Sequence, residues 1–294
     1  MQLPHTPTPA PSRIDATSPT TARARGAVLR QFGLFLLLTY VLTWWVVPLG
    51  SDSFPVFPYG PDLALVVLVS LTGGRAGLRR LGRSLRKWRV HAGWYLFALL
   101  VPAAIGIGSV LAVRAAGAPA SVLPGPDTGI EFLVVLPVMI LVGGAFGEEL
   151  GWRGFALPVL QRRFSPVGAV AIIVVAHAIW HLPLFFTSEP PAAPPFLIEL
   201  AGGGIVLAWL MNSLRVIWVP ILLHGAHNMA QQAFMSEVTG ADLVTLQWFT
   251  AAGWAALALA VLIITRGRLA ADGRAPLTTA LDEEPSTAAE APVR

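Results

Sequence analysis

Long apolar runs separated by short polar segments dominate the sequence between residues 31 and 265. A helix needs about 20 predominantly apolar residues to cross the hydrocarbon core of a bilayer. Eight runs approach that length, at about 31–49, 60–74, 92–113, 132–160, 167–187, 196–213, 216–234 and 247–265. The pattern predicts an all-α polytopic membrane protein, a bundle of about eight transmembrane helices.

The two ends of the chain lack such runs. Residues 1–30 are rich in Pro, Thr, Ser, Ala and Arg, and residues 269–294 end in an acidic, Pro-containing stretch. Segments of this composition bury too little apolar surface to offset the entropy of ordering. We therefore expect disordered tails at 1–30 and 269–294 around a transmembrane domain at 31–268. The first apolar run is too long for the core of a signal peptide, so no cleaved leader is expected.

The composition supports a membrane protein and excludes some kinds of site. Of the 294 residues 55% are hydrophobic and 12% are charged, whereas about a quarter are charged in soluble domains. The absence of cysteine excludes disulfides and thiolate metal ligands. The basic pI of about 10.3 follows from membrane topology, so we expect no nucleic-acid partner.

The basic residues predict the orientation. The loop at 74–90, GRAGLRRLGRSLRKWRV, carries only basic charges and is therefore expected in the cytoplasm. Eight crossings then place both termini there. Leu78, Leu81, Leu85 and Trp88 recur at helical spacing, which indicates either an amphipathic surface helix or a simple topology anchor. The Ala-, Arg- and Gly-rich composition indicates a GC-rich bacterial genome, hence a bacterial cytoplasmic membrane.

A few ionisable or amide side chains interrupt the predicted spans. Such residues cost several kcal/mol unless they are paired, and therefore indicate function. They are Glu148, Glu149, Arg153, His177, His181, Glu199, His224, His227 and Asn228. At a rise of about 1.5 Å per residue, Glu148, His181 and His224 lie roughly 13–22 Å from the cytoplasmic ends of three different helices. We expect these three side chains to meet in the middle of the membrane.

Spacing within one helix separates two roles. Glu149 and Arg153 stand at i,i+4 with the acid first, the favourable order for an ion pair, so we interpret them as a structural pair. Glu148 points about 100° away and is left to face a cavity, where a carboxylate can act as a general base or acid. His224 and Asn228 share one helix face.

Three other polar residues favour simpler interpretations. His177 shares a face with His181, but an isolated intramembrane histidine often only forms a hydrogen bond between helices. We interpret His177 and His227 in this way. Glu199 stands at the start of a helix near the outer interface, where an acid favours the helix dipole, and we assign it no role.

Three ordered motifs resemble those of a known family. EELGWR at 148–153 fits an EExxxR motif, WHLP contains the second motif's histidine, His181, and HGAHN at 224–228 fits HxxxN. Together they resemble the CPBP family, the CAAX prenyl endopeptidase and bacteriocin-processing (ABI) intramembrane proteases, over a core of about 130–234. The family's second motif usually reads FxxxH, and here His177 takes the aromatic position.

The resemblance implies an intramembrane endopeptidase. Glu148 would activate water with the help of His181, and His224 and Asn228 would stabilise the oxyanion. Glu149 and Arg153 would complete the first motif. The substrate would be a membrane-associated protein or peptide, prenylated or not.

Two alternatives remain open from sequence. A zinc site would use Glu148, His181 and His224 as ligands with one position left for water. We favour a metal-free site without a cofactor, because a metal-bound Glu148 would not easily serve as the base. The other alternative is a non-catalytic membrane scaffold or immunity-type protein on the same fold. A transporter is less consistent, because the halves of the chain show no internal repeat.

Overall fold

The computed structural model describes residues 19–50, 55–117, 128–235, 238–271 and 277. The described chain contains helices and no strand, which confirms the all-α class. The α-helices are α1 (Pro19–Trp44), α2 (Gly60–Leu85), α3 (Ala92–Ala115), α4 (Thr128–Leu141), α5 (Ala145–Gly151), α6 (Leu157–Gln161), α7 (Pro166–Trp180), α8 (Ala193–Leu214), α9 (Trp218–Met235) and α10 (Gly240–Thr265). Shorter helical turns lie at Val47–Leu49, Trp152–Ala156 and Leu182–Phe186.

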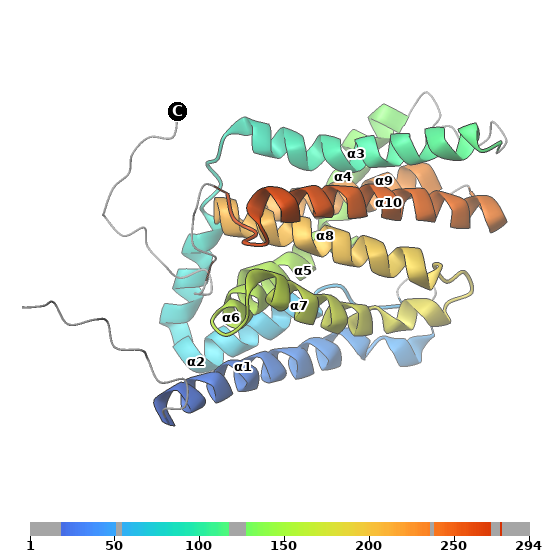
Figure 1. Ribbon diagram of the computed structural model, residues 1–294. Coiled ribbons are helices and arrows are strands. Elements are labelled where there is room, and N and C mark those ends of the chain that lie inside the picture. The colour runs from blue at the N-terminus through green and yellow to red at the C-terminus, as the bar shows by residue number, and fades with distance from the viewer. Residues whose placement is uncertain (1–18, 51–54, 118–127, 236–237, 272–276, 278–294) are drawn as a thin grey trace, which may run out of the picture.

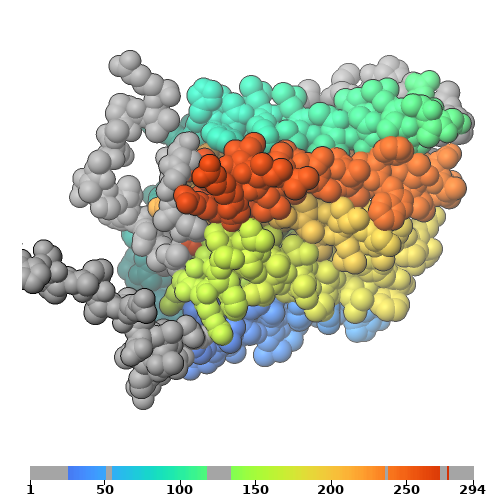
Figure 2. All heavy atoms as spheres, in the orientation of Figure 1, coloured from blue at the N-terminus to red at the C-terminus, as the bar shows by residue number. Residues whose placement is uncertain are grey.

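The bundle has the surface of a multi-pass integral membrane protein. Large apolar side chains face outward, among them Leu37 at 60%, Leu100 at 61% and Ile264 at 81% exposure. Figure 2 shows α3, α10, α8, α7 and α1 as adjoining bands on one face. Such exposure of apolar side chains suits contact with lipid rather than with water.

In the described chain, fewer helices are long and apolar enough for a membrane span than the eight apolar runs in the sequence. Among the described residues, six helices are long and apolar enough to cross a membrane, or seven when the bent pair at 134–161 counts as one span. The expected span at 216–234 is indeed a helix, α9, but it is not among them. Its His, Asn and Gln residues lower its hydropathy, and it packs inside the bundle against α3, α4, α5 and α8.

The run at 132–160 was expected to form one long helix and is instead broken. The chain bends by 42° between α4 and the helix that begins at Ala145, and a π-helical turn at Trp152–Ala156 separates α5 from α6. The break occurs at Gly144, whose φ of 100° disfavours any residue with a side chain. The carbonyl of Leu141 accepts a hydrogen bond from the Tyr59 hydroxyl, so the end of α4 is satisfied.

The basic loop at 74–90 continues as helix through Leu85. Helix α2 kinks at Gly74, with φ 53° and ψ −148°, and its second half runs across the ends of the other helices (Figure 1). One face of this half packs inward, because Leu81 is buried and the carbonyl of Leu85 accepts from the Trp218 indole. The helical part of this segment therefore has one inward face, whereas Trp88 lies beyond its end and is 57% exposed.

The predicted tails are more ordered than expected where the structure describes them. Helix α1 begins at Pro19 and so covers residues 19–30, where Ala and Arg are good helix formers. At the other end Leu269 and Leu277 are buried, and the Leu277 backbone bonds to Gln161 and Asn212. The rest of both tails, 1–18, 272–276 and 278–294, lies outside the described residues.

The start of α1, the end of α10 and the transverse half of α2 lie at the same end of the bundle (Figure 1). The described chain therefore starts and ends on the same side of the bundle. The cytoplasmic orientation of that end remains a prediction from the basic residues.

Candidate active site

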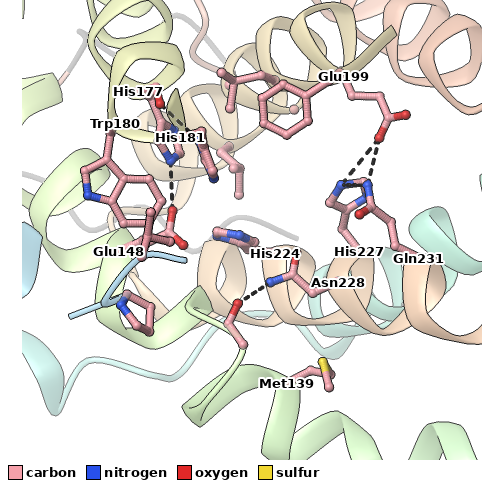
Figure 3. A pocket seen from close by; sticks show the side chains of 18 of the residues that line it. Met139, Glu148, His177, Trp180, His181, Glu199, His224, His227, Asn228 and Gln231 are labelled. Atoms are coloured by element: carbon pink, nitrogen blue, oxygen red, sulfur yellow. Dashed lines mark hydrogen bonds and ion pairs between the residues drawn. The ribbon is translucent and has the colours of Figure 1, made fainter. Parts of the chain in front are cut away.

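A cavity of about 460 Å³ is lined by the polar residues that the sequence placed inside the membrane, except Glu149. Its walls come from α4, α5, α7, α8, α9 and α10, and Figure 3 shows its labelled side chains converging from the first five of these helices. The lining includes Glu148, His177, His181, Glu199, His224 and Asn228. The structure thus places all four predicted catalytic residues, Glu148, His181, His224 and Asn228, around the same space.

Glu148 lies in the first turn of α5, directly after the break, and is 4% exposed. Its Oε2 is 2.8 Å from Nε2 of His177, so the carboxylate is held rather than free as the spacing argument had it. A Cβ on Gly144 would overlap Oε1 of Glu148. The glycine therefore both permits the break and leaves room for the carboxylate.

His177 and His181 come from the last turn of α7 and its C-terminal cap. The Nδ1 of His181 is 3.0 Å from the carbonyl of His177, which fixes the His181 ring. When Nδ1–H donates this bond, the neutral ring has Nε2 as a proton acceptor. The ring of His177 lies between Trp152, at 4.9 Å, and His181, at 4.6 Å between ring centroids.

The role of His177 goes beyond the one expected from sequence. Its contact with Glu148 does join α7 to α5, as an interhelical hydrogen bond would. The same contact adds a third imidazole to the site.

Glu149 forms the ion pair that its spacing predicted. Its Oε1 accepts from Arg153 at 2.8 Å, and both side chains are buried. The same oxygen is 2.8 Å from Nδ1 of His224, a contact between α5 and α9 that spacing within one helix did not reveal. Because Nδ1 is engaged, Nε2 is the nitrogen of His224 left to meet a ligand in the cavity.

Asn228 lies one turn beyond His224 on α9. Its Nδ2 donates to the carbonyl of Gly143 at 2.7 Å, which satisfies a backbone group freed by the break. Helix α9 approaches α4 closely here, because a Cβ on Gly225 would overlap the side chain of Ile140. An amide nitrogen has two hydrogens, so Asn228 retains one for a ligand.

The group best placed to hold a metal differs from the expected one. Ligand atoms of Glu148, His177 and His181 all lie within 4.8 Å of one another in the described chain. The expected set had His224 in place of His177, and His224 is not part of this group. Two imidazoles and one carboxylate form a ligand set that zinc accepts.

A second polar cluster lines another part of the cavity (Figure 3). Glu199, to which we assigned no role, is buried and accepts from Nε2 of Gln231 at 2.9 Å. The same amide nitrogen is 3.0 Å from Nε2 of His227. The ring of His227 contacts that of Trp254 at 5.1 Å.

One buried acid escaped the sequence reasoning. Asp62 stands near the start of α2, and its Oδ1 accepts from the backbone nitrogen of Gly151 at 2.9 Å. It therefore supports the backbone just before the π-helical turn. An acid directly after Pro61 at the head of an apolar run was the signal available in the sequence.

Comparisons with known proteins agree with the motifs. The family described as type II CAAX prenyl endopeptidase Rce1-like matches residues 130–230. A curated relative, CAAX prenyl protease 2 of Methanococcus maripaludis, is 27% identical over an alignment of 147 residues that covers 46% of this chain. The matched part spans about half of that relative, 54% of its length. The family match covers the region of the three ordered motifs and agrees with their resemblance to the CPBP family.

Proposed function

We propose that this protein is an intramembrane endopeptidase that hydrolyses a peptide bond with water activated by Glu148 and His181. The observation that carries the proposal is the convergence of Glu148, His181, His224 and Asn228 on one cavity. Peptide hydrolysis needs a base for the attacking water and donors for the developing oxyanion. This set of side chains can supply both. The catalytic domain would extend over 31–268, with its motif core at 130–234.

The chemistry follows from the contacts. Glu148 takes a proton from water while Nε2 of His181 accepts a hydrogen bond from the same molecule. His177 holds Oε2 of Glu148 and so orients the carboxylate. The hydroxide attacks the carbonyl carbon of the scissile bond, and the proton on Glu148 then passes to the leaving amine.

The oxyanion that forms on the carbonyl oxygen needs donors. Asn228 can give the amide hydrogen that Gly143 does not use, and His224 can donate from Nε2 when its ring is protonated. Glu149 and Arg153 act indirectly, because Glu149 fixes the Nδ1 side of the His224 ring. Glu149 and Arg153 are therefore positioning residues.

A metal would change the role of one residue. Glu148, His177 and His181 would hold a zinc ion, which when bound would supply an activated water. Glu148 would then be a ligand. We favour the metal-free version, in which Glu148 remains the base and no cofactor is required.

The substrate is proposed by class only. We propose a membrane-associated protein or peptide, prenylated or not, as the partner, in addition to the lipid bilayer around the helices. The relative's name ties that relative to CAAX prenyl substrates. For this chain the high Ala, Arg and Gly content points to a bacterial cytoplasmic membrane and argues mildly against a prenylated substrate.

The test compares cells that carry the wild-type protein with cells that carry Glu148→Gln. New peptide termini are mapped in the membrane and secreted fractions. Loss of a general base lowers the rate by about 10²–10⁴-fold, so cleavage products should vanish in the variant at equal protein level. Glu189→Gln, at an exposed acid outside the cavity, is the matched control and should leave the map unchanged.

The alternative function is a membrane scaffold that uses the same residues as contacts between helices. It predicts identical maps in wild type and Glu148→Gln, with the host phenotype restored by the variant. That pair of results would refute the peptidase.

A further inference from the structure

The cavity contains a carboxylate that the proposed chemistry does not use. Glu199 is 8% exposed on α8 and lines the cavity together with His227 and Gln231 of α9. Figure 3 shows these three side chains across the cavity from Glu148, His177 and His181. A buried carboxylate inside a membrane bundle is costly unless a partner compensates its charge.

The neighbours of Glu199 carry no fixed positive charge. Nε2 of Gln231 carries two hydrogens, and it lies 2.9 Å from Oε2 of Glu199 and 3.0 Å from Nε2 of His227. When both hydrogens are used in this way, Nε2 of His227 is the acceptor and its ring is neutral. Arg153, which also lines the cavity, is held by Glu149.

The cavity around Glu199 suits a cation with an apolar stem. Gln231 donates to Oε2, so within the described chain Oε1 remains as the acceptor for a ligand. Trp254, whose ring stands nearly perpendicular to that of His227, also lines the cavity and supplies an aromatic wall. Leucines on α8 supply apolar walls, at Leu200 and Leu207.

We propose that Glu199, oriented by Gln231 and His227, forms a substrate subsite that takes a Lys or Arg side chain of the peptide. The proposal rests on the proposed peptidase only in calling the bound peptide a substrate. It assigns a specificity to the cavity: a hydrophobic segment that carries one basic residue near the scissile bond.

The helix geometry fixes the spacing. His224 and Gln231 are seven residues apart on α9, which corresponds to about 10 Å along the helix. An extended peptide advances about 3.3 Å per residue. The basic residue should therefore stand within about three residues of the bond that is cut.

Binding tests the subsite without any cleavage. The probes are acetylated, amidated Ala/Leu heptapeptides with one central Lys, Arg or norleucine, added to the full chain in phosphatidylcholine nanodiscs. A hydrogen bond to a charged group accounts for about tenfold or more in affinity. The Lys and Arg peptides should therefore bind at least about tenfold more tightly than the norleucine peptide.

The variants identify which carboxylate is responsible. Glu199→Gln should remove the preference for Lys and Arg while norleucine binding is kept. Gln231→Lys should also remove the preference for Lys and Arg, because the new ammonium group pairs with the Glu199 carboxylate. This second variant provides the test if Glu199→Gln does not fold. The preference should persist in Glu189→Gln and in Glu148→Gln. Equal binding of all peptides, or a preference that is lost in Glu148→Gln and kept in Glu199→Gln, would overturn the subsite.

Cleavage gives a second and separate readout. Termini mapped with the wild type should show Lys or Arg within about three residues of the cut, and Glu199→Gln should lose that enrichment. If no Glu148-dependent cleavage is found but binding still depends on Glu199, the peptidase falls and the cation subsite stands. If cleavage is found without the enrichment, the peptidase stands and the subsite falls.

Discussion

Replacing Arg153 with Met tests how the buried charges around the site are held. Arg153 and Glu149 are 3% and 0% exposed, and their closest atoms are 2.8 Å apart. Arg153→Met leaves the Glu149 carboxylate buried with His224 as its remaining partner. Breaking a buried pair in this way costs about 3–5 kcal/mol. We expect Arg153→Met to lower the free energy of unfolding by an amount near the lower end of that range, because His224 still contacts Glu149.

A double-mutant cycle separates this effect from weaker ones. An exposed i,i+4 pair contributes about 0.3–0.5 kcal/mol, and interhelical hydrogen bonds in a membrane protein average about 0.6 kcal/mol. If the pair compensates buried charge, Glu149→Gln and Arg153→Met together should cost clearly less than their sum. We expect a coupling energy of about 2 kcal/mol or more.

The assay is unfolding of the purified protein in mixed micelles titrated with sodium dodecyl sulfate. Fluorescence of the buried Trp152 and Trp180 follows the transition. Arg162→Met replaces an exposed arginine directly after α6 and is the control. It should change the free energy of unfolding by less than about 0.5 kcal/mol. Effects of Glu149 and Arg153 that add within about 0.5 kcal/mol would refute the reasoning.

Three further predictions follow from the described contacts. Gly144→Ala should destabilise the protein by about 1–3 kcal/mol and reduce turnover, because φ at this position is 100° and the new Cβ would overlap Glu148. Gly108→Ala is the control in the same unfolding and cleavage assays, and it should be tolerated because a Cβ at Gly108 meets open space. Gln161→Leu should cost about 1–3 kcal/mol in the unfolding assay, because it removes the Gln161 oxygen that accepts from Nδ2 of the buried Asn212. Cleavage should survive dialysis against a chelator in the metal-free mechanism, and loss that zinc restores would make Glu148 a ligand.

Sequence reasoning predicted those features that depend on the geometry of a single helix. The i,i+4 spacing of Glu149 and Arg153 predicted an ion pair that the structure contains. The constant rise of a helix also placed Glu148, His181 and His224 at similar depths, and all three line one cavity. Depth and periodicity are properties of a single helix and can be read without knowing its neighbours.

Contacts between helices were beyond that reasoning. Whether Glu148 meets His177, or Glu149 meets His224, depends on how α5, α7 and α9 are rotated about their axes and how they cross. The break at Gly144 turns α5 away from α4. The pattern of apolar residues in the run at 132–160 does not indicate this bend. For the same reason the expected metal ligands included His224 in place of His177.

Helix α9 shows why hydropathy is a poor guide to those membrane helices that carry the polar residues of the site. It carries His224, His227, Asn228 and Gln231, and it is not among the six helices that are long and apolar enough to cross a membrane. A helix that packs against α3, α4, α5 and α8 needs little contact with lipid, and its polar groups can pair inside the bundle. The apolar outer helices thus allow α9 to be polar, and this same helix connects the proposed catalytic residues to the proposed cation subsite.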